Sequence, residues 1–351
     1  MFLDWQNITG VLQEILEDEV ASGNECGCQL VIRHHNEIVV DIAAGFLDRS
    51  RRQKVSRDHL FPIFSAGKPV LSTLAWQAFE EGLISFDTPL AAVWQEFNSA
   101  DKAGITFDHA LSHRAGMYLL PKDTPLYDWD AMCRNLAAMT PRNQPGAKTH
   151  YHPLTFAHLV GHAMELLTGE TLAKLIKSRI TIPLNIENAL VFGIDDLQEE
   201  KIVPVDDSLI GNPPAWEAKV MNDPLIRRCC IPSFNGFASA RGLAKFYASL
   251  RGGLIKASTF DLVTSRLYRA PDDPVKEHEW TKFALGIILN GPDNDRRLFC
   301  GHGGAAGAEA FYMPEEDIAF AFVKNRLSPN HPDHPIRDRI SDALQIPRRW
   351  W

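Results

Sequence analysis

Ser65 and Lys68 are spaced so that a lysine amine could reach a serine hydroxyl. They lie in the segment 61–69, Phe-Pro-Ile-Phe-Ser-Ala-Gly-Lys-Pro, which precedes a helical pattern of apolar residues over 70–81. Residues three apart on a helix share a face, and Pro69 suits the first turn, where a missing N–H matters least. Free N–H groups at a helix N-terminus favour developing negative charge. The pair therefore predicts a serine nucleophile that the lysine helps to deprotonate.

A second Ser-x-x-Lys sequence runs from Ser99 to Lys102, in a polar stretch that contains glycine. About one chance match to so short a motif is expected in a chain of this length. Because no helical pattern follows closely, we interpret Ser99 as non-catalytic. Ser65 is favoured by the helical pattern that follows it rather than by the motif itself. The alternative interpretation of Ser65 is an ordinary N-cap serine.

Two further segments carry chemistry-bearing side chains in a suitable setting. Residues 149–161 place Tyr151 just before a helical pattern. Residues 299–307, Phe-Cys-Gly-His-Gly-Gly-Ala-Ala-Gly, form a glycine-rich strand segment near the C-terminus. Glycines there let the backbone approach a ligand closely.

Taken together, the three segments resemble those of the serine β-lactamase-related hydrolases, which include class C β-lactamases, D-Ala-D-Ala peptidases and family VIII carboxylesterases. The order also agrees: Ser-x-x-Lys, then a tyrosine motif, then a C-terminal strand with Lys, His or Trp before x-Gly. Segments 111–117 and 235–244 are similar to two more motifs of these enzymes. The resemblance runs from about residue 10 to residue 345 and implies a β-lactamase-like α+β fold.

The resemblance also implies a role for each matching residue. Ser65 is expected to be the nucleophile, with Lys68 and Tyr151 as the base. The charge of Lys68 would lower the pKa of Tyr151 from its usual value near 10, and Tyr151 would later protonate the leaving alcohol. The backbone N–H groups of Ser65 and Ala305 would form the oxyanion hole. The other expected substrate-binding residues are His302, Gly303 and Gly304.

The chain departs from the β-lactamases at two positions. Those enzymes have Tyr-x-Asn, whereas Pro153 here supplies no side-chain amide. The third motif starts with His302 rather than Lys, so a fixed cation for a substrate carboxylate is missing. His302 is expected either to hydrogen-bond a substrate oxygen or to pack in the wall of the site. Both departures favour simple esters, and the tyrosine motif is similar in wording to that of family VIII carboxylesterases.

We therefore predict a serine carboxylesterase that cleaves a small-molecule ester through an acyl-enzyme on Ser65, without a cofactor. One alternative is acyl transfer from the same acyl-enzyme to an alcohol or amine. Another is β-lactamase or D-Ala-D-Ala peptidase activity. A non-catalytic binding or scaffold protein is the alternative of a different class, and the intact set of Ser65, Lys68 and Tyr151 argues against it. Gly-x-Ser-x-Gly occurs nowhere, which disfavours an α/β-hydrolase elbow.

Two histidine pairs have spacings that a metal site uses. His158 and His162 are four residues apart, but position 159 is Leu, so the zinc motif His-Glu-x-x-His fails. We interpret this pair as ordinary helix packing. His331 and His334 are interpreted as part of a solvated loop. No metal site is expected.

Apolar periodicity indicates the elements that position these residues. A helical pattern over 5–21 precedes two β-rich runs joined by a hairpin turn at 34–37. The other helical patterns are 70–81, 128–139, 154–167, 171–179, 239–250 and 334–344, and the strand patterns are 28–33, 38–44, 283–289, 297–300, 308–313 and 318–323.

This order predicts one catalytic domain over 1–351. An antiparallel sheet flanked by helices would be built from both chain ends, 1–68 and 280–351. A mainly helical lobe over 69–279 would be inserted between them, with a loop-rich excursion at 183–235.

Composition and charge exclude several classes of protein. The 351 residues are 45% hydrophobic, enough for a sizeable core, so a disordered chain is excluded. The net charge of −8 disfavours nucleic-acid binding. No apolar run approaches the roughly 20 residues that cross a bilayer, and no signal-peptide pattern occurs at the N-terminus. We therefore expect a cytoplasmic protein with no membrane partner and six free cysteines, and leave its oligomeric state open.

Overall fold

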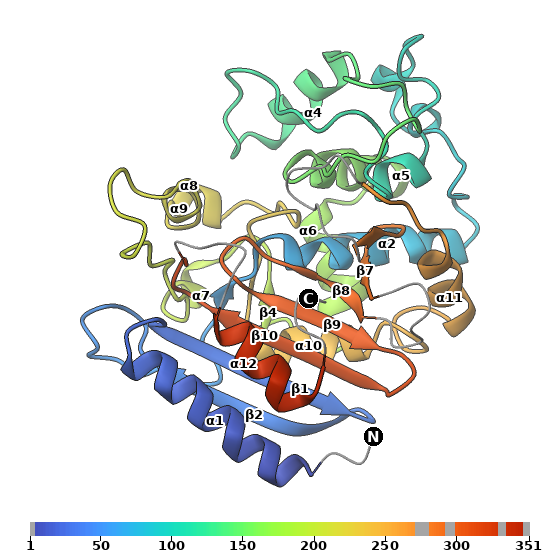
Figure 1. The fold of residues 1–351 in the computed structure, drawn as a ribbon. Coiled ribbons are helices and arrows are strands. Elements are labelled where there is room, and N and C mark those ends of the chain that lie inside the picture. The colour runs from blue at the N-terminus through green and yellow to red at the C-terminus, as the bar shows by residue number, and fades with distance from the viewer. Residues whose placement is uncertain (1–3, 271–280, 292–298, 329–334, 347–351) are drawn as a thin grey trace.

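A seven-stranded antiparallel sheet forms the centre of the computed structural model, which describes residues 4–270, 281–291, 299–328 and 335–346. The strand order is β2–β1–β10–β9–β8–β7–β6, so strands from the two chain ends lie side by side (Figure 1). The predicted α+β architecture is confirmed. The strands are β1 Gly27–His34, β2 Glu37–Gly45, β6 Lys282–Phe283, β7 Ile288–Asn290, β8 Phe299–Gly303, β9 Glu309–Met313 and β10 Ile318–Lys324.

The β1–β2 hairpin turns where the sequence predicts it. His35 and Asn36 both have positive φ, 48° and 61°, the backbone that a tight two-residue hairpin needs and that Asn tolerates well. β1 then pairs with β10 on its other side, with Cys28 opposite Lys324. β1 is buried from Gly27 to Ile32 because it lies between these two neighbours.

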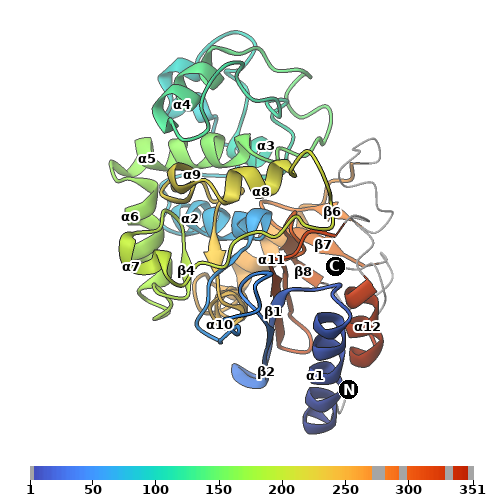
Figure 2. The same cartoon turned by 90° about the vertical axis from the view of Figure 1, so that its left-hand side faces the viewer.

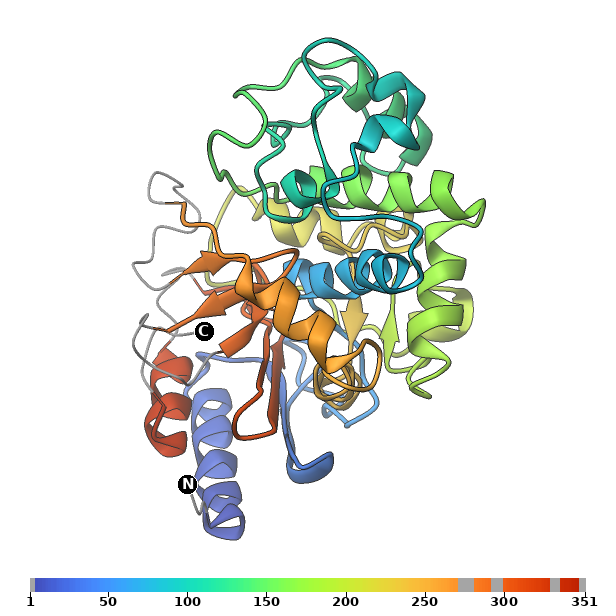
Figure 3. The same ribbon diagram turned by 90° about the vertical axis from the view of Figure 1, so that its right-hand side faces the viewer.

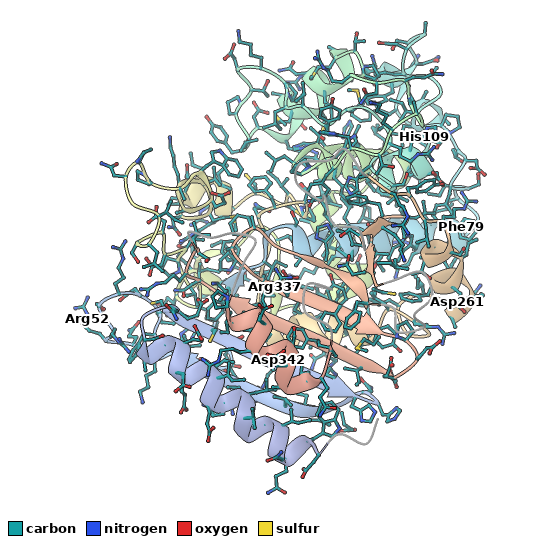
Figure 4. All side chains as sticks on the ribbon, in the orientation of Figure 1. Arg52, Phe79, His109, Asp261, Arg337 and Asp342 are labelled. Carbon is teal, nitrogen blue, oxygen red and sulfur yellow. The ribbon has the colours of Figure 1, made fainter. Side chains whose placement is uncertain are left out.

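Two helices cover the outer face of the sheet. Helix α1 (Trp5–Ala21) and helix α12 (Pro335–Leu344) lie side by side there (Figure 1). The fully buried Leu12 and Leu16 of α1 share a hydrophobic cluster with Leu30 and Phe322 of the sheet. Arg337 of α12 (Figure 4) adds an ion pair, since its Nη1 lies 3.4 Å from Oε1 of Glu309 on β9.

The inner face of the sheet is covered by helices from the middle of the chain (Figure 2). Helix α10 (Ala240–Ala248) packs on β1, β9 and β10. Helix α2 (Lys68–Glu80) lies beyond it, against β8. The remaining helices are α3 Phe107–Leu111, α4 Trp129–Ala138, α5 His162–Thr168, α6 Leu172–Ile176, α7 Asp196–Glu199, α8 Trp216–Met221, α9 Pro224–Arg227 and α11 Ala257–Ser265.

Helices α3, α4 and α5 and their loops stand above α2, away from the sheet (Figure 3). Residues 183–235 contain only short elements, α7 to α9 and the two-residue strand β4. The division of the chain into lobes at 68 and 280 stays a prediction. Among the helices that the structure describes, none is long and apolar enough to span a membrane.

The structure differs from expectation at residues 283–289, which form two strands rather than one. A tight turn separates β6 from β7, and Gly286 within it has φ +85°. Helix α2 binds this turn, because Ser72 Oγ donates to the Gly286 carbonyl at 3.0 Å and Trp76 Nε1 donates to the Leu285 carbonyl at 2.8 Å. The apolar run is therefore folded back by contacts that its own pattern does not reveal.

A second, three-stranded sheet was not predicted. It consists of β3 (Phe61–Pro62), β5 (Phe237–Ala238) and β4 (Leu190–Val191), in that order. Strands of two residues are too short to show an alternating pattern. β3 matters for the site because the chain leaves it directly into the turn that carries Ser65.

Candidate active site

Ser65 lies in a single 3-10 turn, η1 (Phe64–Gly67), that runs directly into helix α2. Phe64, the residue before Ser65, has φ +45°, a conformation that costs energy for an aromatic residue. Two neighbouring anchors hold this strained backbone: Ile63 N–H donates to the Gly236 carbonyl at 2.9 Å, and the Phe64 ring is buried. Ser65 itself stays partly exposed, as a nucleophile that meets a substrate must be.

The amine of Lys68 is fully buried and faces three oxygen atoms. Nζ lies 2.8 Å from the Pro153 carbonyl, 2.7 Å from the Ser233 carbonyl and 3.0 Å from Ser65 Oγ. Carbonyl oxygens only accept, so two N–H bonds of the amine point at them. The third position on Nζ faces Ser65 Oγ, where an ammonium donates a proton and a neutral amine can accept one.

Tyr151 lies beside Lys68. Its ring is 4.9 Å from Lys68 Nζ, and the side chain is only 4% exposed. The Tyr151 hydroxyl is 3.4 Å from Nε2 of His302. The ring also stacks on Phe283 of β6, with centroids 5.9 Å apart. The structure thus brings together Ser65, Lys68, Tyr151 and His302, which come from three separate segments of the chain.

The end of strand β8 lies against the turn that carries Ser65. A Cβ atom on Gly304 would be 2.3 Å from the Ile63 carbonyl oxygen, so only glycine permits this approach. Gly304 N–H donates to the Ala308 carbonyl at 2.7 Å, which closes a tight turn around Ala305. The expected oxyanion-hole residues Ser65 and Ala305 therefore belong to adjoining segments, with His302 and Gly303 leading into the same turn.

Other candidates are placed outside this group. Ser99 Oγ donates to Asp101 at 2.6 Å, and Lys102 Nζ lies 3.5 Å from the same carboxylate. His158 stacks on Trp129 with ring centroids 4.7 Å apart, and His162 lies 3.4 Å from Glu165.

Over the described ranges, no group of three or more His, Cys, Asp or Glu side chains is arranged to hold a metal ion. His331 and His334 lie outside the described residues.

A family model described as Beta-lactamase matches residues 12–345. The chain belongs to the beta-lactamase family. The chain is 27% identical to the curated protein Esterase/beta-lactamase LipL of Mycobacterium tuberculosis (strain ATCC 25618 / H37Rv) over 340 residues. That match covers 86% of this chain and 77% of the relative.

Solved structures of similar proteins have the same fold. A family VIII carboxylesterase superposes with a TM-score of 0.86 at 26% identity, over 96% of this chain and 97% of the other. A penicillin-binding protein homologue from Caulobacter crescentus superposes with a TM-score of 0.83 at 29% identity, over 97% of each chain. The predicted resemblance and the β-lactamase-like fold are confirmed, and the chain is a hydrolase of this fold.

Proposed function

We propose that this hydrolase is a serine carboxylesterase that cleaves small-molecule esters through an acyl-enzyme on Ser65. The observation that carries the proposal is the 3.0 Å approach of Lys68 Nζ to Ser65 Oγ, with Tyr151 directly beside it. A hydroxyl becomes a competent nucleophile when a neighbouring group takes its proton. No metal or cofactor enters this chemistry.

Acylation follows from the hydrogen-bonding positions around Lys68. Ser65 Oγ attacks the ester carbonyl as its proton passes to the Lys68–Tyr151 pair, and a bond forms from Oγ to the carbonyl carbon. The bond to the alcohol oxygen then breaks, and the same proton returns from Tyr151 to that oxygen. Water attacks the acyl-enzyme by the same proton path, which frees the acid and restores Ser65.

The oxyanion is stabilised by the backbone N–H groups of Ser65 and Ala305. Ser65 is in the first turn of a helical segment, where N–H groups lack partners within the helix. The tight turn around Ala305 lies against that segment through Gly304 and Ile63. Fixed donors of this kind supply about 3–4 kcal/mol each in well-studied hydrolases.

The substrate class follows from two positions. Pro153 offers no side-chain amide, and its backbone carbonyl accepts from Lys68. His302 faces Tyr151 and offers no fixed cation for a carboxylate. A substrate that needs neither an amide contact nor a cation is favoured, and a simple ester needs neither. The names of the esterase relatives support the same choice.

The test compares kcat/KM for p-nitrophenyl butyrate and for nitrocefin on one enzyme preparation, beside a panel of p-nitrophenyl esters of graded acyl length. Each missing polar contact is worth about 1–3 kcal/mol of binding, and two contacts give a preference of about 30-fold or more for the ester. A nitrocefin value equal to or above the ester value would overturn the esterase proposal in favour of a β-lactamase.

A further inference from the structure

The segment that carries Tyr151 has no regular secondary structure to hold it. Residues 148–152 form neither helix nor strand. A sheet ladder or helix normally satisfies backbone groups and fixes a side chain in place. The phenol of Tyr151 must nevertheless stay beside Lys68, so other groups must fix the peptide units on either side of it.

His113 binds the backbone on both sides of Tyr151. The N–H of His150 donates to the His113 carbonyl at 2.9 Å, and the N–H of His152 donates to Nδ1 of the His113 ring at 3.1 Å. The ring of His113 also packs edge-on against the Tyr151 ring, with centroids 4.9 Å apart. His113 has φ +61°, a left-handed conformation that costs energy and that these bonds sustain.

His152 adds a second set of bonds from within the segment. Its side chain is fully buried, its Nδ1–H donates to the His150 carbonyl at 2.6 Å, and its Nε2 accepts from the Met117 N–H at 3.1 Å. One ring nitrogen donates while the other accepts, which only a neutral imidazole can do. Burial lowers the pKa of His152 to about 3, so the ring keeps this neutral form.

We propose that His113 and His152 are positioning residues that together hold the Tyr151 phenol against Lys68, in place of a helix or a sheet ladder. Both act through Tyr151, whose neighbouring peptide units they bind. The inference rests on the proposed function, because it assumes that Tyr151 takes part in activating Ser65. It adds that two neutral imidazoles, which bind the backbone on either side of Tyr151, decide whether the Tyr151 hydroxyl is in place.

The paired variants are His113→Leu and His113→Asn. Leucine removes the ring acceptor, whereas asparagine places an oxygen close to the Nδ1 position and tolerates positive φ. His152→Asn similarly keeps a donor for the His150 carbonyl, and His152→Leu keeps none. His158→Leu is the matched control, since His158 is an equally buried histidine outside the site.

The first readout is the rate at which a fluorophosphonate probe labels Ser65, together with kcat and KM for p-nitrophenyl butyrate. A displacement of about 1 Å in a catalytic group lowers the rate by about 100-fold. We expect losses of that size in labelling and kcat for both leucine variants, with KM little changed, and recovery of most of the rate in both asparagine variants. His158→Leu should label at the wild-type rate.

The second readout is the pH profile of labelling. The described titratable groups that face Tyr151 are Lys68 of α2, His302 of β8 and His113, with His150 and His152 beside it in the chain. If Tyr151 moves away from the Lys68 ammonium, the phenolate loses a favourable charge, and the acid limb shifts to higher pH. His113→Leu should show that shift, and a merely destabilised fold would not.

The outcomes separate the two proposals. A wild-type enzyme that the probe fails to label contradicts the proposed function itself. If the probe labels the wild type, and labels His113→Leu and His152→Leu at the same rate, the positioning role alone is overturned. The positioning role is also overturned if the asparagine variants label and turn over as slowly as the leucine variants, while thermal unfolding shows that all of them are folded.

Discussion

Nε2 of His302 lies 3.4 Å from the hydroxyl of Tyr151, while Nδ1 of the same ring lies 2.7 Å from the Gly303 carbonyl. Because that carbonyl only accepts, Nδ1 carries a proton, and a neutral ring presents its lone pair to Tyr151. His302 thus faces Tyr151, part of the proposed base, rather than the substrate carboxylate that a lysine at this position would bind. This relationship distinguishes the site from the β-lactamase pattern described above.

Replacing His302 should separate the two substrate classes. His302→Lys restores a fixed cation, so the ratio of nitrocefin to p-nitrophenyl butyrate kcat/KM should rise by about tenfold, the value of one contact near 1.4 kcal/mol. His35→Lys, on the exposed β1–β2 turn, is the matched control and should leave the ratio unchanged. An unchanged ratio in His302→Lys would show that residue 302 does not set the substrate class.

Ser65→Ala should abolish ester hydrolysis, whereas Ser99→Ala should leave it nearly intact. Loss of a covalent nucleophile lowers kcat by about 10⁴ to 10⁶. Ser99 bonds to Asp101, so its hydroxyl has a structural partner instead. Steady-state kinetics on p-nitrophenyl butyrate measures both variants, and the opposite pattern would mean that the wrong motif was chosen.

Tyr151→Phe and Lys68→Met should differ in stability although both lose activity. Removing the Tyr151 hydroxyl should lower kcat by about 10²–10⁴ and leave the fold intact. Lys68→Met also removes the lysine donor from the Pro153 carbonyl, at a cost of about 1–3 kcal/mol, whereas the Ser233 carbonyl still accepts from Ser65 Oγ. Denaturant unfolding measures the difference. Equal stability of the two variants would contradict the buried contacts of Lys68.

Stability should fall as the pH drops below 6.5, and His158 is one cause. Burial lowers the pKa of His158 to about 4 from 6.5. Between these values the unfolded chain binds a proton that the native ring does not. Its contribution to stability is therefore complete above pH 6.5 and is lost as the pH falls toward 4, at about 1.4 kcal/mol per pH unit.

His158→Leu should make that pH dependence shallower by about one proton. The His158 side chain is fully buried and stacks on Trp129, so a leucine of similar size keeps an apolar side chain in the same place. Urea unfolding at pH 4.5, 5.5 and 7 measures the slope for variant and wild type. Parallel curves would contradict a buried, neutral His158.

The site could be predicted from sequence where its geometry is local or where a motif marks it. Ser65 and Lys68 are three residues apart, so their contact follows from helix geometry alone. The roles of Tyr151 and His302 follow only from the family resemblance, because the two residues lie 151 positions apart in the chain. The β1–β2 hairpin was predictable in the same local way, from two short apolar runs around a turn.

The remaining features of the site depend on contacts that do not require a particular residue type and so cannot be recognised in the sequence. Lys68 binds two backbone carbonyls, Pro153 and Ser233, and any residue type offers a carbonyl. The role of His113 depends on a segment more than 35 residues away. The sequence predicts a regular helix over 154–167, and its pattern does not reveal that residues 157–161 form a π-helical turn.

The most direct test of the central claim is to trap the acyl-enzyme. Wild-type enzyme mixed with a p-nitrophenyl ester is quenched in acid within the first turnover, digested and analysed by mass spectrometry, beside Ser65→Ala and Ser99→Ala. We expect one acyl group on the peptide that contains Ser65, present in wild type and Ser99→Ala and absent from Ser65→Ala. Ester hydrolysis that persists in Ser65→Ala, or an acyl group on any other residue, would contradict the central claim.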